Sequence, residues 1–359
     1  MNTTASSTPR VSGRSAARRL GGPVPQHGTI AVLVIVAIAL PWVLDSSFWM
    51  GTLTLTLIWG VLNQSWNLVL GSSGIWHFGQ LAVYAIGGYA AAILSLRSGL
   101  PAVLALAVGG LLAAAVSLVL SVPTLRLRGI YVSLLTFGFA EVIRLLVIAD
   151  QSGFTGGSFG LSGFDGFGLD DWDPVSRRRA YYWIALGVLA LASVVMFWIS
   201  RSPLGTALTA LRDSPALAAA RGISPRRYQS TAFAISGFFA GVAGGLYAFT
   251  YGVISPSVMG LGPLTLLVTM LVVGGLGTQT GPLVGTLVIS VVSARLEQYP
   301  EVRLILLGLV LLLMVLLMPR GIVPRVASIR RRIQDWVDEE EEVDDEEDLA
   351  VADDSVPTR

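Results

Sequence analysis

The chain has 359 residues, of which 53% are hydrophobic and only 13% are charged, with 24 basic and 23 acidic side chains. Soluble domains carry about 25% charged residues, so this composition excludes an ordinary soluble protein and indicates one that crosses a membrane several times. The absence of cysteine and the presence of only two histidines exclude a disulfide framework and a thiolate metal site, and argue against any metal centre.

Long apolar runs follow a first segment, residues 1–27, that is basic and rich in Ser, Gly and Pro and is predicted to be disordered. The runs do not alternate as barrel strands do, and a span in lipid must satisfy its own backbone hydrogen bonds, so each is predicted to be a helix. The predicted fold is an all-α polytopic transmembrane bundle. About eight full spans are expected, at residues 29–44, 52–70, 79–97, 102–121, 129–149, 181–200, 229–250 and 302–318.

A shorter, broken pair of helices is predicted at 263–277 and 282–294, where neither piece is long enough to cross the hydrocarbon core. Arginines orient the bundle, because basic residues concentrate in cytoplasmic loops. They place both termini in the cytoplasm, with 201–228 as a cytoplasmic loop and 150–180 as an external loop. The predicted transmembrane domain then covers 28–326, and residues 327–359, basic and then acidic, are predicted to be a disordered cytoplasmic tail.

Two glycine-rich stretches, GSSGIWHFGQ at 71–80 and GGLGTQTGP at 274–282, interrupt the apolar pattern. Paired interruptions in two halves of a chain point to a transport site. Ordinary cytoplasmic turns with glycine caps would give the same sequence pattern. The candidate pathway residues are polar groups and glycines in and beside these stretches: Asn63, Asn67, Gly71, Gly74, His77, Gln80, Thr136, Glu141, Gly277 and Thr278.

Several of these residues have a structural alternative. Asn63 and Asn67 could bond a neighbouring helix, and His77 could anchor the chain at the membrane interface beside a tryptophan. Glu141 could form a structural ion pair with Arg144, three residues further along the same helix face. Glycines within the spans, Gly87, Gly241 and Gly245, are expected to let helices approach closely.

The cytoplasmic loop contains two short helical pieces, TALTALRD and PALAAARG. Pro215 suits the first turn of the second piece, and Gly222 suits its C-terminal cap. A short helix of small residues flanked by arginines could dock into a groove on a soluble partner. The alternative is a solvated loop held by arginine contacts to lipid headgroups.

Five motifs occur in one order along the chain: LRLRGIYVSLLTFGFAEVIR, TGGSFGLSG, LTALRDSPALAAARGI, GGLGTQTGPLVG and MPRGIVP. Together they resemble the permease subunits of branched-chain amino-acid ABC transporters, of the LivM type. The resemblance implies a non-enzymatic, multi-pass subunit of the bacterial inner membrane. Such a subunit forms half of the pathway of an ATP-driven importer of branched-chain or other hydrophobic amino acids.

The same resemblance implies the partners: a second related permease, two cytoplasmic ATPases, an extracytoplasmic substrate-binding protein and membrane lipid, but no nucleic acid. ATP would be bound by the partners, because the chain has no P-loop motif and no cofactor of its own is implied. Contact with the ATPase is assigned by the resemblance to one segment of the cytoplasmic loop: Arg212, Asp213, Ala219, Arg221 and Gly222.

The sequence departs from the family pattern at several positions. Ala219 stands where a glutamate is common, Ile75, His77 and Gln80 alter the first glycine-rich stretch, and Phe159 alters the external loop. These departures leave open an importer of urea, short amides, or aromatic or dicarboxylic compounds. A second alternative is a secondary transporter or channel that works without ATP, for which Glu141 is the one candidate proton-carrying carboxylate. A membrane enzyme would need clustered His, Asp or Glu residues at the membrane face, and the sequence predicts no such cluster there.

Overall fold

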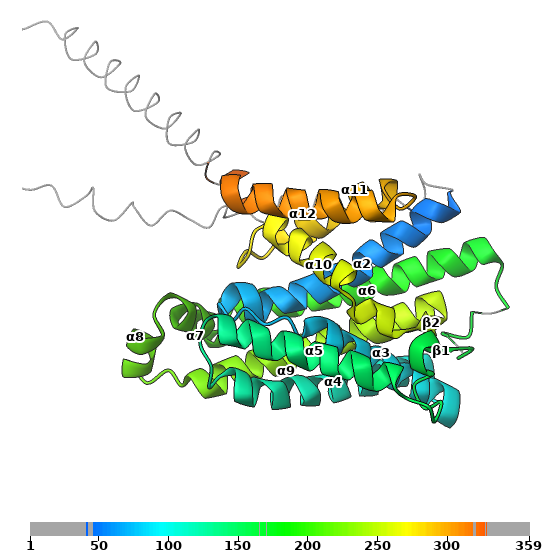
Figure 1. The fold of residues 1–359 in the computed structure, drawn as a ribbon, viewed down its shortest axis with the longest axis horizontal. Helices are drawn as coiled ribbons and strands as arrows, with labels where there is room; N and C mark the ends of the chain where they lie inside the picture. Colours follow the sequence, from blue (N-terminus) through cyan, green and yellow to red (C-terminus); the bar gives the residue numbers. More distant parts are fainter. Residues whose placement is uncertain are drawn as a thin grey trace, which may run out of the picture.

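The protein was analysed as a computed structural model, which describes residues 41, 46–164, 166–169, 171–318, 321–326 and 328 (Figure 1). Within these residues the chain is almost entirely helical. The long helices are α2 (Ser47–Asn67), α3 (Gln80–Ser98), α4 (Ala102–Thr124), α5 (Ile130–Ile148), α6 (Pro174–Arg201), α9 (Pro225–Tyr251) and α12 (Pro300–Leu317). The shorter helices are α7 (Pro203–Asp213), α8 (Pro215–Ala220), α10 (Leu261–Gly274) and α11 (Gly281–Arg295). The segments predicted at 1–27 and 327–359, and nearly all of the span predicted at 29–44, lie outside the described residues.

Six helical segments among the described residues are long and apolar enough to cross a membrane: α3, α4, α5, α6, α9 and the segment from Glu301 that includes α12. Helices α10 and α11 have 14 and 15 residues and form the predicted short pair, each about 21 to 23 Å long against a core of about 30 Å. Helix α2 has 21 residues but is not among these six, and it carries amide side chains at positions 63, 64 and 67. The predicted polytopic all-α fold is confirmed.

At two of the helices, a polar cap followed by proline sets a start earlier than predicted. Helix α6 starts at Pro174 rather than 181, because Asp173 caps it by accepting a hydrogen bond from the Ser176 N–H at 3.1 Å. Helix α9 starts at Pro225 rather than 229, with Ser224 as its cap. A polar cap followed by proline is a local start signal that the hydropathy pattern hides. The loop predicted to be external therefore ends at 173, and the loop predicted to be cytoplasmic holds the two predicted helical pieces as α7 and α8.

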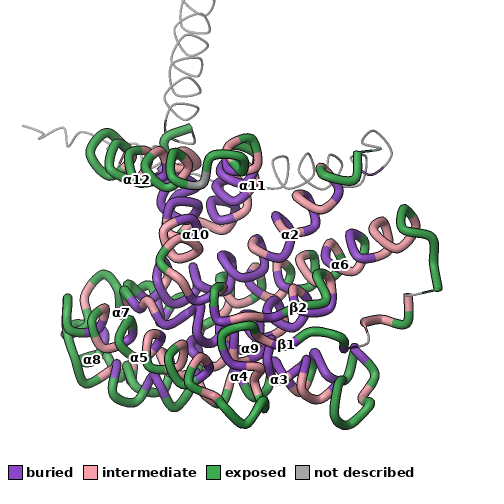
Figure 2. Tube along the Cα trace, turned by 45° about the vertical axis from the view of Figure 1, so that its right-hand side comes forward, coloured by how far each residue is buried: buried purple, intermediate pink, exposed green. Residues whose placement is uncertain are grey.

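Helix α9 lies at the centre of one layer, where it packs against α3 and α4, while α2 joins this layer to α6 and α11. Helices α10, α11 and α12 form a second layer on the other side of α2 (Figure 1). Figure 2 shows that α3 and α9 are largely buried and that α12 is mostly exposed on the outside of the bundle. The buried core is thus concentrated around α2, α3 and α9.

Glycines set the separation of the helices in the first layer. A Cβ on Gly87 of α3 would overlap the backbone of Gly241 on α9, and one on Gly244 would overlap the carbonyl of Tyr84. A Cβ on Gly245 would meet the side chain of Leu106 on α4. The predicted packing role of Gly87, Gly241 and Gly245 is confirmed, since only residues without a side chain allow this approach.

The two ends of the bundle differ in structure. At one end, α7 and α8 project beyond the long helices (Figure 1). At the other end, the two-residue strands β1 (Leu161–Ser162) and β2 (Val253–Ile254) pair antiparallel, with Leu161 opposite Ile254. This pairing ties the loop after α5 to the end of α9.

We expect Gly87→Ala to lower the free energy of unfolding by about 1–3 kcal/mol, because the new methyl group meets backbone that cannot rotate away. Thermal unfolding of the purified protein in detergent measures this effect. Gly187→Ala on α6 is the matched control, since nothing lies within 4 Å of its added Cβ. The control should be neutral or stabilising by up to about 1 kcal/mol. Equal shifts in the two variants would contradict the packing role.

Candidate transport and coupling site

The two glycine-rich interruptions meet in space. Helix α2 ends in a π-helical turn, η1 (Leu68–Ser72). Such turns are rare in proteins, and those that occur often lie at functional sites. A Cβ on Gly71 in this turn would overlap the backbone nitrogen of Gly277, which lies between α10 and α11 and has a φ of 75°. Glycine is therefore required on both sides of the contact, by close approach at one residue and by backbone conformation at the other.

Asn67 joins the two interruptions through both ends of its amide. Its Oδ1 accepts a hydrogen bond from the Gly277 N–H at 2.8 Å, and its Nδ2 donates to the Thr278 carbonyl at 2.9 Å. Non-helical backbone within a membrane protein needs such partners, because lipid offers none. Asn67 therefore supplies the bonds that allow the chain to break between α10 and α11.

Two other amides of α2 also bond neighbouring helices. The Nδ2 of Asn63 donates to Thr286 Oγ1 on α11 at 2.9 Å, and Gln64 Oε1 accepts from Ser193 Oγ on α6 at 2.8 Å. Both amides are buried within this chain. Asn63 thus makes the contact between helices that the sequence left open as an alternative, and Gln64 makes a similar contact.

Arg212, on α7, reaches the same place from the loop. Its Nη1 donates to the Gly71 carbonyl at 3.0 Å, and its Nε donates to Asp213 Oδ1 at 3.0 Å. A Cβ on Gly74 would meet Arg212 Cγ, and one on Gly277 would lie 2.9 Å from Arg212 Nη1. We call Asn67, Gly71, Gly277, Thr278 and Arg212 the glycine junction.

His77 and Gln80, the other predicted residues of the first interruption, are buried. His77 is fully buried, with its ring 4.9 Å from that of Phe233, and its carbonyl accepts a hydrogen bond from Trp66 Nε1 at 3.0 Å. Neither ring nitrogen of His77 has a partner among the described residues. The prediction that His77 anchors at an interface is therefore wrong, because the chain turns inward here and leaves Trp76 exposed instead.

Two further candidates join the first interruption to other helices. Gln80 Nε2 donates to Ser65 Oγ at 3.2 Å and to Ser236 Oγ on α9 at 3.1 Å. Thr136 Oγ1 on α5 accepts from the Phe78 N–H at 2.9 Å. The sequence thus selected residues that cluster in space, and their role in a pathway stays a prediction.

Glu141 lies apart from this cluster. It pairs with Arg144 on α5, whose Nε donates to Glu141 Oε2 at 3.0 Å, and both side chains are partly exposed. The structural ion pair described as an alternative is therefore present. Within the described residues, no group of three or more His, Asp or Glu side chains gathers to hold a metal ion.

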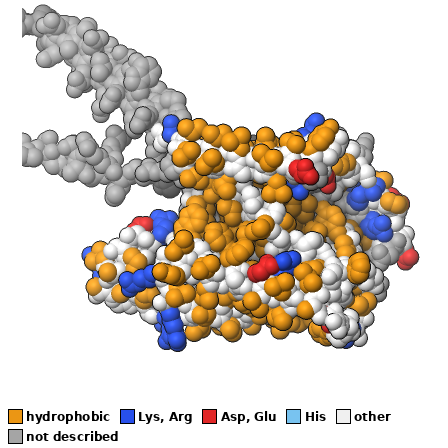
Figure 3. All heavy atoms as spheres, in the orientation of Figure 1, with side chains coloured by type: hydrophobic (Ala, Val, Ile, Leu, Met, Phe, Trp, Pro, Cys, Tyr) orange, Lys and Arg blue, Asp and Glu red, His pale blue; other side chains and the backbone are white. Residues whose placement is uncertain are grey.

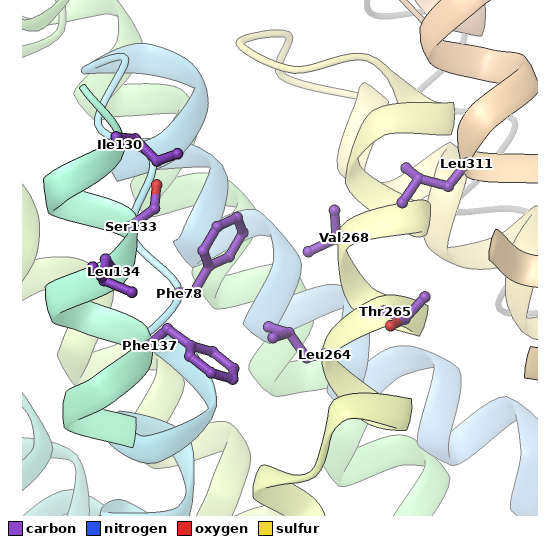
Figure 4. A pocket seen from close by; sticks show the side chains of 9 residues that line it. All are labelled: Phe78, Ile130, Ser133, Leu134, Phe137, Leu264, Thr265, Val268 and Leu311. Atoms are coloured by element: carbon purple, nitrogen blue, oxygen red, sulfur yellow. The ribbon is translucent and has the colours of Figure 1, made fainter. Parts of the chain in front are cut away.

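The sequence did not reveal an open apolar groove between α5 and α10, with a volume of about 410 Å³ (Figure 4). Residues from four separate segments line it: Phe78, Ile130, Ser133, Leu134, Phe137, Leu264, Thr265, Val268 and Leu311. Side chains from α5 and α10 point toward one another across it in Figure 4. Because no single segment carries the groove, no local pattern could have predicted it.

At the end of the bundle, α7 is buried on one side and α8 is exposed. Leu208 and Leu211 of α7 pack into the bundle, whereas Leu217 of α8 is 55% exposed. Gly222 has a φ of 84° and follows α8 as the predicted cap. The predicted coupling residues Asp213, Ala219, Arg221 and Gly222 are all exposed here. Basic side chains gather over this end in Figure 3.

Comparison with known proteins gives matches over most of the chain. The sequence profile of the family described as branched-chain amino acid transport system / permease component matches residues 48–315. The high-affinity branched-chain amino acid transport system permease protein LivM of Escherichia coli is 33% identical over 330 residues, covering 85% of this chain and 76% of that protein. LivM of Salmonella typhimurium is 31% identical with the same coverage.

A second kind of permease also matches, over a shorter stretch. The permease protein LivH of Salmonella typhimurium is 30% identical over 153 residues, which cover 42% of this chain and 49% of that protein. No solved structure matches the chain.

We expect Asn67→Ala to lower the free energy of unfolding by about 1–3 kcal/mol, because it leaves the Gly277 N–H and the Thr278 carbonyl without their buried partner. Thermal unfolding in detergent is the measurement. Ser200→Ala, which removes an exposed hydrogen bond to the Phe197 carbonyl, serves as the control and should change little. A loss no greater than that of the control would show that the junction does not depend on the amide.

Proposed function

The chain belongs to the family of branched-chain amino acid transport system permease components, and from this premise we propose that it forms half of the pathway of an ATP-driven importer. The proposed solutes are branched-chain or other hydrophobic amino acids, as the names of the relatives suggest. One observation supports coupling to ATP above all: Arg212 extends from the exposed α7–α8 segment into the glycine junction.

The proposed partners follow from the same premise. A second permease is supported by the match to both LivM and LivH, two permease proteins named for one kind of transport system. Two cytoplasmic ATPases would supply the nucleotide chemistry, since this chain has no P-loop sequence. The proposal assigns no catalytic step to this chain and no cofactor.

Movement would pass from α8 to the membrane helices through Arg212. An ATPase that displaces α8 also displaces α7, whose buried Leu208 and Leu211 tie it to the bundle. The guanidinium of Arg212 then pulls on the Gly71 carbonyl in the π-helical turn, where helical bonding is already altered. Because Asn67 bonds the second interruption, both breaks would shift together, as packed elements with two discrete arrangements do.

The outer end offers a surface for a substrate-binding protein. The loop after α5 is held by the β1–β2 pairing and by Asp150, whose Oδ2 accepts from Thr155 Oγ1 at 2.8 Å. Hydrogen bonds from Ser152 and Thr155 hold the pKa of Asp150 well below its usual range, so this bonding persists at neutral pH. The loop presents Phe159, which is 93% exposed, to a partner.

A proton-coupled transporter that works without ATP has less support. Its one candidate carboxylate, Glu141, is engaged by Arg144 on the same helix. An ionised carboxylate beside a guanidinium is a poor proton carrier, because the positive charge favours the unprotonated form.

We expect Leu217→Asp to abolish co-purification of the ATPase with this chain, because it places a charge on the exposed apolar side chain of α8. Pull-down from membranes of cells expressing all subunits measures this association. Leu127→Asp, at an exposed leucine in the turn after α4, is the matched control and should retain the ATPase. Retention by both variants would argue against docking through α8.

We expect Arg212→Ala to uncouple transport from ATP hydrolysis, lowering solute uptake per ATP by about tenfold, because a charge-assisted hydrogen bond to Gly71 is lost. Proteoliposomes containing the complete complex allow uptake and phosphate release to be measured together. Arg226→Ala, at an exposed arginine in the first turn of α9, should leave the ratio unchanged. An unchanged ratio in Arg212→Ala would remove Arg212 from the coupling route.

A further inference from the structure

The face of α5 that lines the groove between α5 and α10 also carries the Glu141–Arg144 pair, about one helical turn beyond Phe137. Resting on the importer function proposed above, we propose that this flank of α5 binds the transported amino acid. Glu141 receives its ammonium group, Arg144 its carboxylate, and the groove its apolar side chain. We call these two charged residues and the groove the α5 flank.

The register of α5 places both features on one side of the helix. Five residues of α5 follow one another at spacings of four, three, four and three, which keeps them on one helix face: Ile130, Leu134, Phe137, Glu141 and Arg144. The first three line the groove. The side chains that α5 buries, at 132, 136, 140 and 147, fall on another face. One helical turn, about 6 Å, therefore separates Phe137 from Glu141.

The groove is suited to an aliphatic group. Seven of its nine lining residues are apolar, and they come from both sides of the opening (Figure 4). Its two hydroxyl groups are already used, since Ser133 Oγ donates to the Trp76 carbonyl at 2.8 Å and Thr265 Oγ1 donates to the Leu261 carbonyl at 2.9 Å. The groove therefore offers burial without a polar group that would favour a polar side chain.

The charged pair is suited to a zwitterion. Its side chains are 40% exposed for Glu141 and 31% for Arg144, although they lie in a span of otherwise apolar character. Arg144 uses two of its five N–H donors on Glu141, which leaves donors for a carboxylate. An α-amino acid carries both of its charges on one carbon, so a neighbouring acid and base can receive them together.

This chemistry distinguishes among solutes. A lipid acyl chain would fill the groove but make no contact with the two charges through a charged group of its own, and urea has neither an apolar side chain nor charged groups. An amino acid with an aliphatic side chain uses both parts of the α5 flank. Ile130 and Leu134 remain 78% and 67% exposed in this chain, so the flank has an open side.

The first test reverses the charges. The double variant Glu141→Arg/Arg144→Glu keeps an ion pair at the same spacing, so the complex should assemble and unfold at the wild-type temperature. In proteoliposomes with the binding protein, ATP and leucine, uptake should fall by about tenfold or more, because each charged group of the solute now faces a side chain of the same charge. Wild-type uptake by this variant would assign the pair a purely structural role and overturn the proposal.

The second test narrows the groove. Val268→Trp should lower leucine uptake more than valine uptake and shift their ratio by about tenfold, because one methylene group can alter discrimination to this extent. Leu146→Trp, on another face of α5 and 64% exposed, is the control and should leave the ratio unchanged. An equal loss of both uptakes in Val268→Trp would indicate an acyl chain or a partner side chain in the groove and overturn its assignment to the solute.

Wild-type complex provides the reference that separates the two proposals. If it accumulates no leucine on addition of ATP, the importer function itself fails. If it accumulates leucine and the charge-reversed variant does so equally, only the assignment of the α5 flank fails.

Discussion

Lipid offers no hydrogen-bond partner to a polar backbone group, and this is the main constraint on the chain. The two hydrogen bonds of Asn67 to the backbone of residues 277 and 278 supply such partners within the protein. A membrane helix can stop short only where another part of the protein takes up the exposed N–H and carbonyl groups. The second interruption is satisfied in part by an amide of α2, and the first receives a guanidinium from α7. The breaks in the helices and the polar residues of α2 are therefore one arrangement.

This arrangement explains why α2 carries amide side chains near its C-terminal end. Its amides reach α6, α11 and the second interruption, so the surrounding helices supply hydrogen-bond partners for these buried polar side chains. The layer of α3, α4 and α9 is held differently, through glycines that bring backbones together. One layer is thus fixed by close packing, while the other is joined at a junction of hydrogen bonds that a displaced arginine can alter.

The glycine junction and the α5 flank divide the proposed work between two places. The junction connects the exposed α7–α8 segment to the helix breaks, and the flank carries the charged and apolar groups that match an amino acid. Thr136 links them, since its hydroxyl bonds the Phe78 N–H in the first interruption and Phe78 also lines the groove. A shift of the first interruption would therefore change the shape of the groove, which joins motion to binding.

The sequence by itself determined the class of fold, most of the spans, the short pair α10–α11 and the helical pieces α7 and α8, because hydropathy, helix length and proline or glycine caps act within one segment. It also selected Asn67, Gly71, Gly277 and Arg212 as residues of interest. Only the tertiary structure decided that they meet, since Arg212 is 141 positions from Gly71 and Asn67 is 210 positions from Gly277. The burial of His77 and the groove between α5 and α10 were decided there too. Such contacts depend on how the helices cross in three dimensions, and no pattern along a single helix determines how it crosses the others.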